Sequence, residues 1–170
     1  MDMANAIALL DKTAINPSSG LPEELFLLVS RLTPLINVDL LIKNELGQTL
    51  LTWRDDGFYP PSWHVPGGII RYKETFDKRI KETAKNELGA EVVYEPKPLA
   101  INEVIIEKRK NRGHFISILY ACRLITPLND ESKCQNKAPR KNEWQWHSAC
   151  PENIISVHKM YKEYINGTKY

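Results

Sequence analysis

A chain of 170 residues is long enough to bury one hydrophobic core, and 42% hydrophobic with 26% charged residues is ordinary for a globular protein. The net charge of +2 shows no excess of either sign, so we expect neither nucleic acid nor a membrane surface as a partner. No apolar run approaches the roughly 20 residues of a membrane span. The N-terminus carries Asp2 and no basic segment, so we expect no signal peptide.

The chain begins with a short extension, residues 1–20, which ends in the segment NPSSG. We expect a single domain to follow over residues 21–170. Its first helix is expected to begin at Leu21, because Pro22 and two glutamates occupy the first turn, and to end before Pro34.

The centre of the chain is rich in strands. We expect strands over residues 38–44, 48–54, 90–96, 98–109, 114–125 and 142–148. The first two are joined by a tight turn and are expected to pair as a hairpin. Helices are expected over 75–88, with Gly89 as the C-cap, and over 151–167. This order predicts an α/β (α+β) fold, a layered α/β/α domain with a mixed sheet.

The three cysteines, Cys122, Cys134 and Cys150, are an odd number and include no CxxC pair. This pattern is typical of free thiols in a reducing compartment. We therefore expect a cytoplasmic location, free thiols and no zinc site.

The helix expected over 75–88 carries an acid on its apolar face. At about 100° per residue, the apolar stripe consists of Phe76, Ile80, Thr83 and Ala84. Glu87 falls in the centre of that stripe. A carboxylate is costly there unless it is paired or binds a metal. Glu87 is therefore either part of a local ion pair at the helix end or a metal ligand.

Two glycines before this helix favour the metal ligand. Gly67 and Gly68 let the backbone approach a ligand closely, and the N-terminus of the following helix attracts anions. Mg²⁺ is usually held by one or two carboxylates, with substrate phosphates completing its shell.

The spacing of these residues resembles the Nudix box, G-x5-E-x7-R-E-U-x-E-E-x-G-U, where U is apolar. The matching residues are Gly68, Glu74, Ala84, Glu87, Gly89 and Ala90. Glu82 stands where the box has arginine, and Thr83 and Asn86 stand where it has glutamates. Nudix pyrophosphohydrolases use several of these glutamates to hold metal ions and cut a P–O bond. Of the metal-binding acids, this chain retains only the last.

The same reduced box is found in the GDP-mannose mannosyl hydrolase branch, which cuts the sugar C–O bond and releases GDP. The segments TPLINVDLLIKNELGQTLLTWR and AKNELG also resemble that branch, and the resemblance covers roughly residues 33–165. It implies a Nudix-type α/β/α sandwich, Mg²⁺ as cofactor with Mn²⁺ possible, a nucleoside diphosphate sugar as substrate, and a homodimer.

The resemblance implies roles for several residues. Glu87 takes the metal-ligand position, with Gly67 and Gly68 supplying backbone contacts. Arg54 matches an arginine that contacts the nucleotide diphosphate, although an ion pair with the adjacent Asp55 and Asp56 is the simpler interpretation. Ile69 replaces a branch arginine that contacts the diphosphate, and Arg71 is a candidate substitute.

The general base has several candidates. Lys141 aligns with the histidine base of the branch, but a lysine base needs a lowered pKa, and phosphate binding suits it better. Asp39 and His114 match strand positions of the branch. Glu103 and Glu107 are further candidate bases.

Two more groups have both a functional and a structural interpretation. The basic run 108–112 either folds over a phosphate or is a solvated turn. Four rings are candidates for stacking on a base or for packing in the core: Trp63, His64, Trp144 and Trp146.

Three functions fit this sequence. The first is a Mg²⁺-dependent hydrolase of a nucleoside diphosphate sugar that cleaves the C–O bond. The second is a conventional Nudix pyrophosphohydrolase, and the third is a Nudix-fold nucleotide-binding module without catalysis.

Overall fold

The computed structural model describes residues 2–135 and 138–169. Its helices are α1 (Met3–Thr13), α2 (Glu23–Val29), α3 (Phe76–Leu88) and α4 (Lys162–Ile165), with 3-10 helices η1 (Pro17–Ser19), η2 (Asp130–Ser132) and η3 (Ser156–Tyr161). Its strands are β1 (Leu35–Ile42), β2 (Thr49–Arg54), β3 (Ser62–His64), β4 (Gly67–Ile69), β5 (Val92–Tyr94), β6 (Ala100–Ile105), β7 (His114–Leu124) and β8 (Trp144–His147).

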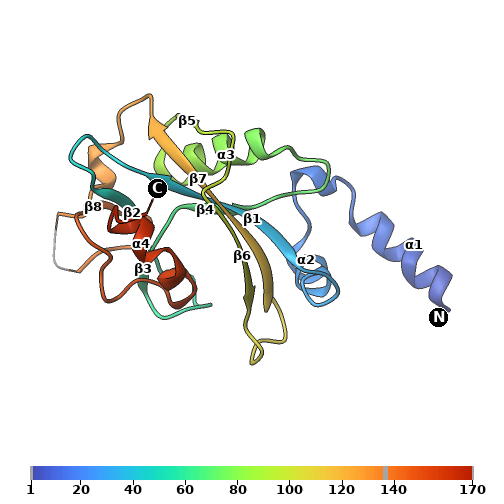
Figure 1. Cartoon of the computed structure of the whole chain (residues 1–170). Helices are drawn as coiled ribbons and strands as arrows, with labels where there is room; N and C mark the ends of the chain where they lie inside the picture. Colours follow the sequence, from blue (N-terminus) through green and yellow to red (C-terminus); the bar gives the residue numbers. More distant parts are fainter. Residues whose placement is uncertain (1, 136–137, 170) are drawn as a thin grey trace.

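The strands form two sheets (Figure 1). The larger sheet has the order β4-β1-β7-β5, and β6 also pairs with β7. Its two longest strands, β1 and β7, run parallel, whereas β4, β5 and β6 pair antiparallel. The smaller sheet, β3-β2-β8, is antiparallel. The predicted mixed sheet and layered α/β architecture are confirmed.

The hairpin predicted from the two adjacent strands is largely wrong. β1 and β2 belong to different sheets, and they meet next to the turn through the bridge between Lys43 and Thr49 and the Asn44–Gln48 backbone hydrogen bond. β7 pairs along the whole of β1, whereas β4 pairs with Asn37–Asp39 on the other edge. Beyond the turn, β2 pairs with β3 and β8 instead of β1.

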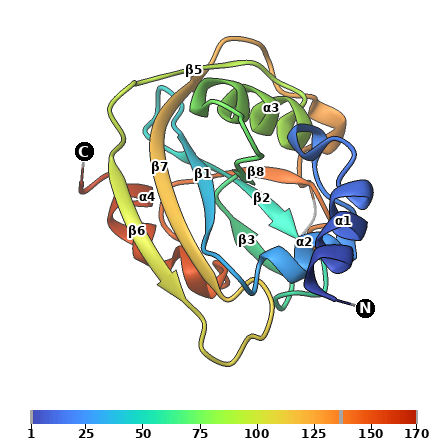
Figure 2. The same cartoon turned by 90° about the vertical axis from the view of Figure 1, so that its right-hand side faces the viewer.

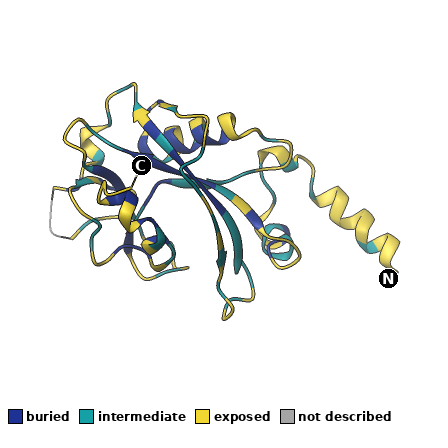
Figure 3. Ribbon diagram, in the orientation of Figure 1, coloured by how far each residue is buried: buried dark blue, intermediate teal, exposed yellow. Residues whose placement is uncertain are grey.

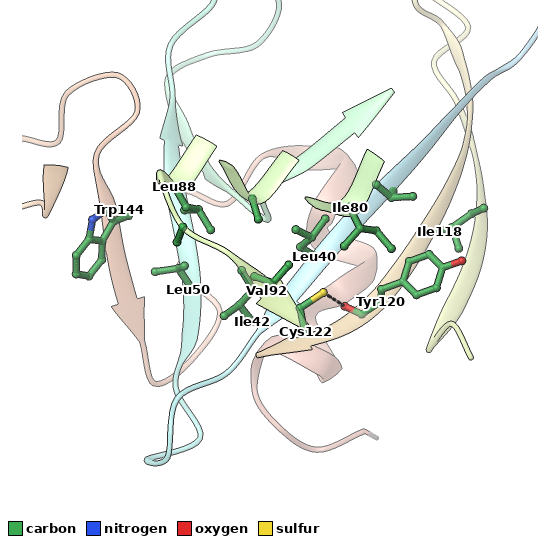
Figure 4. Packing of buried hydrophobic residues seen from close by; sticks show 13 residues of the cluster. Leu40, Ile42, Leu50, Ile80, Leu88, Val92, Ile118, Tyr120, Cys122 and Trp144 are labelled. Atoms are coloured by element: carbon green, nitrogen blue, oxygen red, sulfur yellow. Dashed lines mark hydrogen bonds between the residues drawn. The ribbon is translucent and has the colours of Figure 1, made fainter. Parts of the chain in front are cut away.

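Two hydrophobic clusters cover opposite faces of β1. Val38, Leu40 and Ile42 face α3, together with Ile80 and Leu88 from that helix (Figure 4). The other cluster lies beneath the C-terminal segment and contains Leu41, Leu51, Trp63, Leu119, Tyr161 and Ile165. Asp39 points to this second face and is only 2% exposed, so it does not lie on a solvated face of the strand.

Helix α3 ends at the predicted residue with Gly89 as its C-cap, and it begins one residue after the predicted start, with Thr75 as its N-cap. The Thr75 hydroxyl accepts a hydrogen bond from the Lys78 N–H at 3.2 Å, and Gly89 closes the helix with φ at 63°. Phe76 departs from the predicted buried stripe, because 46% of it is exposed in the first turn, where its ring lies 6.2 Å from that of Tyr120. Arg79 is buried instead.

The two ends of the chain differ from the prediction. Every residue of α1 is exposed or half-exposed, and the helix stands away from the body of the molecule (Figures 1 and 3). Helix α2 ends at Val29, well before Pro34. The predicted C-terminal helix is split into η3 and the short α4. Within the described ranges, no helix is long and apolar enough to cross a membrane.

Helix η3 explains how the C-terminus reaches the sheet. A 3-10 helix places residues i and i+3 in line. His158 and Tyr161 are three residues apart, and both face Asp39 of β1. Figure 2 shows the molecule from the side where α1 and α2 lie opposite the β6–β7 ribbon.

Candidate active site

A cavity of about 870 Å³ lies against β1, β4 and the C-terminal end of β2. Its polar part is lined by Asp39, His64, Glu87 and His158. Its cationic part is lined by Arg54, Arg71, Arg112 and Lys141. Its apolar part is lined by Leu21, Phe26, Val29, Leu35, Val104 and Phe115. The volume suits a nucleotide-sized ligand, since ligand pockets usually measure about 300–1,000 Å³.

Glu87 lies at the polar end of the cavity, and 28% of its side chain is exposed. Its Oε1 accepts a hydrogen bond from the Gly67 N–H at 3.3 Å, and its Oε2 accepts one from the Thr52 hydroxyl at 3.3 Å. His64 Nε2 lies 3.4 Å from the same Oε2. The carboxylate is therefore oriented by three neighbours while remaining open to the cavity.

Asp39 is the second carboxylate of the polar end and is buried behind Gly67. The Tyr161 hydroxyl donates to its Oδ2 at 2.6 Å, and the Asn37 amide donates to its Oδ1 at 3.0 Å. Burial raises the pKa of Asp39 to about 7, and the negative charge of Glu87 adds to the rise, against the lowering effects of Tyr161 and His64. Asp39 is thus held partly protonated near neutral pH.

The two histidines of the polar end make different hydrogen bonds. His64 Nδ1 lies 2.9 Å from the Thr52 carbonyl oxygen. His158 Nδ1 instead accepts the Val65 N–H at 3.0 Å, and its Nε2 lies 4.0 Å from Asp39 Oδ1. Burial, with the nearby His64 and Arg54, holds the pKa of His158 well below its usual range, so this ring is neutral.

The glycines predicted to give backbone contacts are sites of close approach. A Cβ on Gly67 would lie 2.3 Å from Asp39 Oδ1, and a Cβ on Gly68 would lie 2.3 Å from Thr83 Oγ1. Contacts this short are not compatible with any larger side chain in the same backbone. The glycines therefore bring β4 directly against the acids and α3.

Glu74, the other matched acid of the motif, does not line the cavity as Glu87 does. It forms two hydrogen bonds of 2.8 Å with the Arg79 guanidinium, and its side chain is 1% exposed. Burial favours a higher pKa for Glu74, but Arg79 and the Arg71 N–H together hold the pKa below its usual range. This ion pair fixes the loop between the glycines and α3.

The basic run 108–112 folds back toward the cavity. The Arg112 guanidinium lies over the Phe58 ring at 4.1 Å, and that of Arg109 lies over the Tyr59 ring at 3.9 Å. Burial and the neighbouring Arg54 lower the pKa of Arg112. Within the described part of the chain, Arg112, Arg71 and Lys141 form no ion pair with a carboxylate.

The remaining predicted residues divide into two groups. Arg54 lines the cavity but is also bound to Asp56 at 2.6 Å, so the expected ion pair is present. His114 and Glu103 contact one another at 3.3 Å and do not belong to the cavity lining. Among the four rings considered for stacking, the cavity is lined by His64, while Trp63 and Trp144 are buried in the core.

The residues present fit a divalent cation. Glu87 supplies a carboxylate that is open to the cavity, with Asp39 as a second acid behind it. Among the described residues, no three His, Cys, Asp or Glu side chains are arranged as a metal-binding group. An ion at Glu87 would therefore rely on substrate phosphates or water for the rest of its shell.

The chain matches the family model for the NUDIX domain over residues 33–150. The chain belongs to the NUDIX family. This confirms the predicted membership of the Nudix family.

A curated relative is the low-salt glycan biosynthesis protein Agl8 of Haloferax volcanii, 33% identical over 82 residues. The match covers 48% of this chain and 52% of Agl8, so it spans about half of that relative's length.

Solved Nudix structures share the fold. The chain is 18% identical to a possible asymmetric diadenosine tetraphosphate hydrolase from Jonesia denitrificans, with a TM-score of 0.60 over 80% of this chain and 96% of the other. A MutT protein from Methanosarcina mazei gives the same values. A UDP-X diphosphatase is 17% identical, with a TM-score of 0.56 over 96% of this chain and 67% of the other.

Sequence reasoning missed part of the polar end. His158 and Tyr161 were assigned only to a closing helix, and Asn37 was not considered. A signal was present in the spacing of His158 and Tyr161, because residues three apart share one side of a helix. What the sequence lacked was the position of that helix against β1.

Proposed function

We propose that this chain is a metal-dependent hydrolase of a nucleoside diphosphate sugar, which releases the sugar and the nucleoside diphosphate. The observation that carries the proposal is the clustering of Arg71, Arg112 and Lys141 around the cavity that also contains Glu87. These cations come from distant parts of the chain. Together with a divalent cation they match the charge of a diphosphate group.

The apolar part of the cavity suits a nucleoside base. Phe26 and Phe115 line it, and aromatic rings bind the flat faces of bases. The polar part around Asp39 suits the hydroxyl groups of a sugar. The diphosphate then lies between them, beside the cationic side chains.

We assign the role of general base to Asp39. Of the candidate bases, Asp39 and Lys141 line the cavity, and the exposed ammonium of Lys141 suits phosphate binding. A water oxygen bonds to C1 of the sugar as the C1–O bond breaks. The bonding electrons leave with the nucleoside diphosphate, and the water proton passes to the Asp39 carboxylate.

Glu87 would hold the divalent cation, which we expect to be Mg²⁺ or Mn²⁺, as the resemblance implies. When bound, the cation neutralises the charge that develops on the diphosphate leaving group. Because that group leaves readily once its charge is neutralised, a single retained acid suits C–O cleavage better than attack at phosphorus.

The relative Agl8 supports a sugar-containing substrate, because its name places it in glycan biosynthesis. GDP-mannose is the first substrate to test. A homodimer and a cytoplasmic location stay predictions of the sequence.

The deciding experiment is hydrolysis of GDP-mannose and UDP-glucose in water enriched in ¹⁸O, with mass analysis of the products. We expect free sugar together with unlabelled nucleoside diphosphate. Label in nucleoside monophosphate or sugar phosphate would show pyrophosphohydrolysis instead. Thermal stabilisation by these ligands without any product would show a binding module.

A further inference from the structure

His64 differs from the other cavity side chains in the hydrogen bond that fixes its ring. It ends β3 and pairs with Thr52 of β2 in the smaller sheet. Its Nδ1 lies 2.9 Å from the Thr52 carbonyl oxygen. A carbonyl oxygen only accepts, so Nδ1 must carry the hydrogen. In the neutral ring, the lone pair is therefore on Nε2.

That lone pair is directed at another acceptor. His64 Nε2 lies 3.4 Å from Glu87 Oε2, and neither atom has a hydrogen to give when the ring is neutral. The Thr52 hydroxyl lies 3.3 Å from Oε2 and 3.4 Å from Nε2, but its one hydrogen can satisfy only one of these two acceptors. The lone pair that is left on Nε2 is matched by a proton on Nε2 or by a metal ion that both atoms share.

The surroundings favour the metal ion. Metal-binding histidines almost always donate the other ring N–H to a carbonyl or a carboxylate, as His64 does to Thr52. Two donor atoms that each lie about 2.1 Å from one ion are roughly 3.0–3.4 Å apart at angles of 90–109°. The distance of 3.4 Å between Nε2 and Oε2 is within this range.

His158 gives an internal comparison. Its Nδ1 accepts the Val65 N–H, so in its neutral form the hydrogen is on Nε2, which faces Asp39. His158 thus presents a hydrogen to its acid, whereas His64 presents a lone pair. Of these two histidines, His64 alone has the arrangement of a metal ligand.

We propose that His64 Nε2 and the Glu87 carboxylate form a nitrogen–oxygen ligand pair for the divalent cation of this cavity. The pair replaces oxygen ligands that the motif has lost at Thr83 and Asn86. Imidazole nitrogen suits Co²⁺, Ni²⁺ and Zn²⁺ better than Mg²⁺. The chain is therefore expected to bind Co²⁺ and Zn²⁺ more tightly than Mn²⁺, and Mg²⁺ most weakly. This inference rests on the proposed function for the use of the ion in turnover, but metal binding is testable without substrate.

The experiment is calorimetric titration of the full chain with Co²⁺, Zn²⁺, Mn²⁺ and Mg²⁺, without nucleotide. We expect one Co²⁺ per chain and a loss of about 100-fold in Co²⁺ affinity in His64→Gln and in His64→Phe. Mg²⁺ affinity should change much less. Glu87→Gln should weaken the binding of every ion.

Two histidines outside the cavity lining supply matched controls. His114→Gln and His147→Gln should each keep Co²⁺ affinity within about threefold of the wild type. Circular dichroism checks that each variant is folded, and His64→Phe preserves a planar ring if His64→Gln is unstable.

A spectroscopic readout identifies the donor atom directly. Electron spin-echo spectra of the Mn²⁺ or Cu²⁺ complex should show nitrogen modulation from an imidazole, and His64→Gln should remove it. Unchanged Co²⁺ affinity and unchanged nitrogen modulation in folded His64 variants would overturn the proposal. Hydrolysis of GDP-mannose with Mg²⁺ in those same variants would leave the proposed function standing. A wild type that binds Co²⁺ through His64 but hydrolyses no nucleotide sugar would overturn the proposed function alone.

Discussion

Two glutamates of the same motif, Glu74 and Glu87, have opposite surroundings. Glu74 is held by the Arg79 guanidinium through two bonds of 2.8 Å and is 1% exposed. Glu87 is 28% exposed, and its contacts with Gly67, Thr52 and His64 are all 3.3–3.4 Å long. The first is closed by an ion pair, and the second is open to a ligand.

Two residues that match the same motif therefore need not have the same function. Glu82 stands where the motif has arginine, but Arg79, one helical turn earlier, supplies the guanidinium that binds Glu74. The partner of Glu74 is therefore an arginine at a position that the motif does not specify. Of the two acids at matched positions, Glu74 stabilises the fold, whereas Glu87 is available to bind a ligand.

The largest expected effect concerns Glu74. Glu74→Gln leaves the buried Arg79 charge without its partner and should lower the free energy of unfolding by about 3–5 kcal/mol. The double variant Glu74→Met with Arg79→Met removes both charges and should recover most of that loss. Urea denaturation measures both. If Glu74→Gln unfolds at the wild-type urea concentration, the ion pair has no structural role.

Glu87→Gln should reduce activity and leave stability nearly unchanged. We expect turnover of the best nucleotide sugar to fall about 10²–10³-fold, because the cation loses its carboxylate, while stability changes by less than about 1 kcal/mol. Initial rates and urea denaturation test the two statements. Glu95→Gln, an exposed glutamate outside the cavity, is the matched control. Equal stability losses in Glu74→Gln and Glu87→Gln would remove the distinction between the two acids.

The sequence predicted the fold well where local pattern decides it. The C-cap Gly89 follows from its position after the helical pattern, and the buried Ile80 and Ala84 and the misplaced Glu87 follow from helical periodicity. Arg79 did not follow, because its burial depends on an ion pair with a loop residue that periodicity does not describe.

The site was predictable only in part, and for a related reason. Gly67, Gly68 and Glu87 come from one continuous motif, so spacing alone brought them together. His158 and Tyr161 lie about 120 residues after Asp39, and their contact depends on how η3 packs on the sheet. The splitting of β1 and β2 into two sheets is likewise set by long-range pairing, not by the turn between them.

Substitutions at Gly67 and Gly68 test the difference between Glu74 and Glu87 by introducing a steric clash near each acid. Gly68→Ala places a methyl group 2.3 Å from Thr83 Oγ1 and 2.9 Å from Arg79 Cδ, on the side of Glu74. Gly67→Ala places one 2.3 Å from Asp39 Oδ1, on the side of Glu87. Each overpacked contact should cost about 1–3 kcal/mol. Gly68→Ala should reduce mainly stability, and Gly67→Ala should also reduce turnover.

A second substitution makes this test specific. Thr83→Ala removes the hydroxyl that collides with the methyl group of Gly68→Ala, and within the described chain Thr83 Oγ1 has no hydrogen-bond partner to lose. The double variant Gly68→Ala with Thr83→Ala should regain much of the lost stability. If Thr83→Ala leaves the Gly68→Ala loss unchanged, then the cost arises from the backbone and not from this contact.

The smallest expected effect is on the pH dependence of stability, and it separates the cavity from the ion pair. Glu74 has a lowered pKa, so its contribution is present above pH 4.5 and is lost on further acidification. Asp39 has a pKa raised from 3.8 to about 7, so its contribution falls as pH rises through this window. His158 has a pKa lowered below 6.5, so its contribution is lost as pH falls below 6.5.

Asp39 and His158 therefore oppose one another between about pH 4.5 and 6.5, each by up to about 1.4 kcal/mol per pH unit. The wild type should show a shallow slope there. Asp39→Asn should lose stability on acidification below pH 6.5, and His158→Asn should lose stability as pH rises from 4.5 to 7. Urea denaturation in chelator at half-unit steps measures the three curves. If the free energy of unfolding of all three proteins changes with pH in parallel, neither Asp39 nor His158 changes its protonation on folding. The cavity then contributes no more to the pH dependence of stability in this window than the ion pair of Glu74 and Arg79 does.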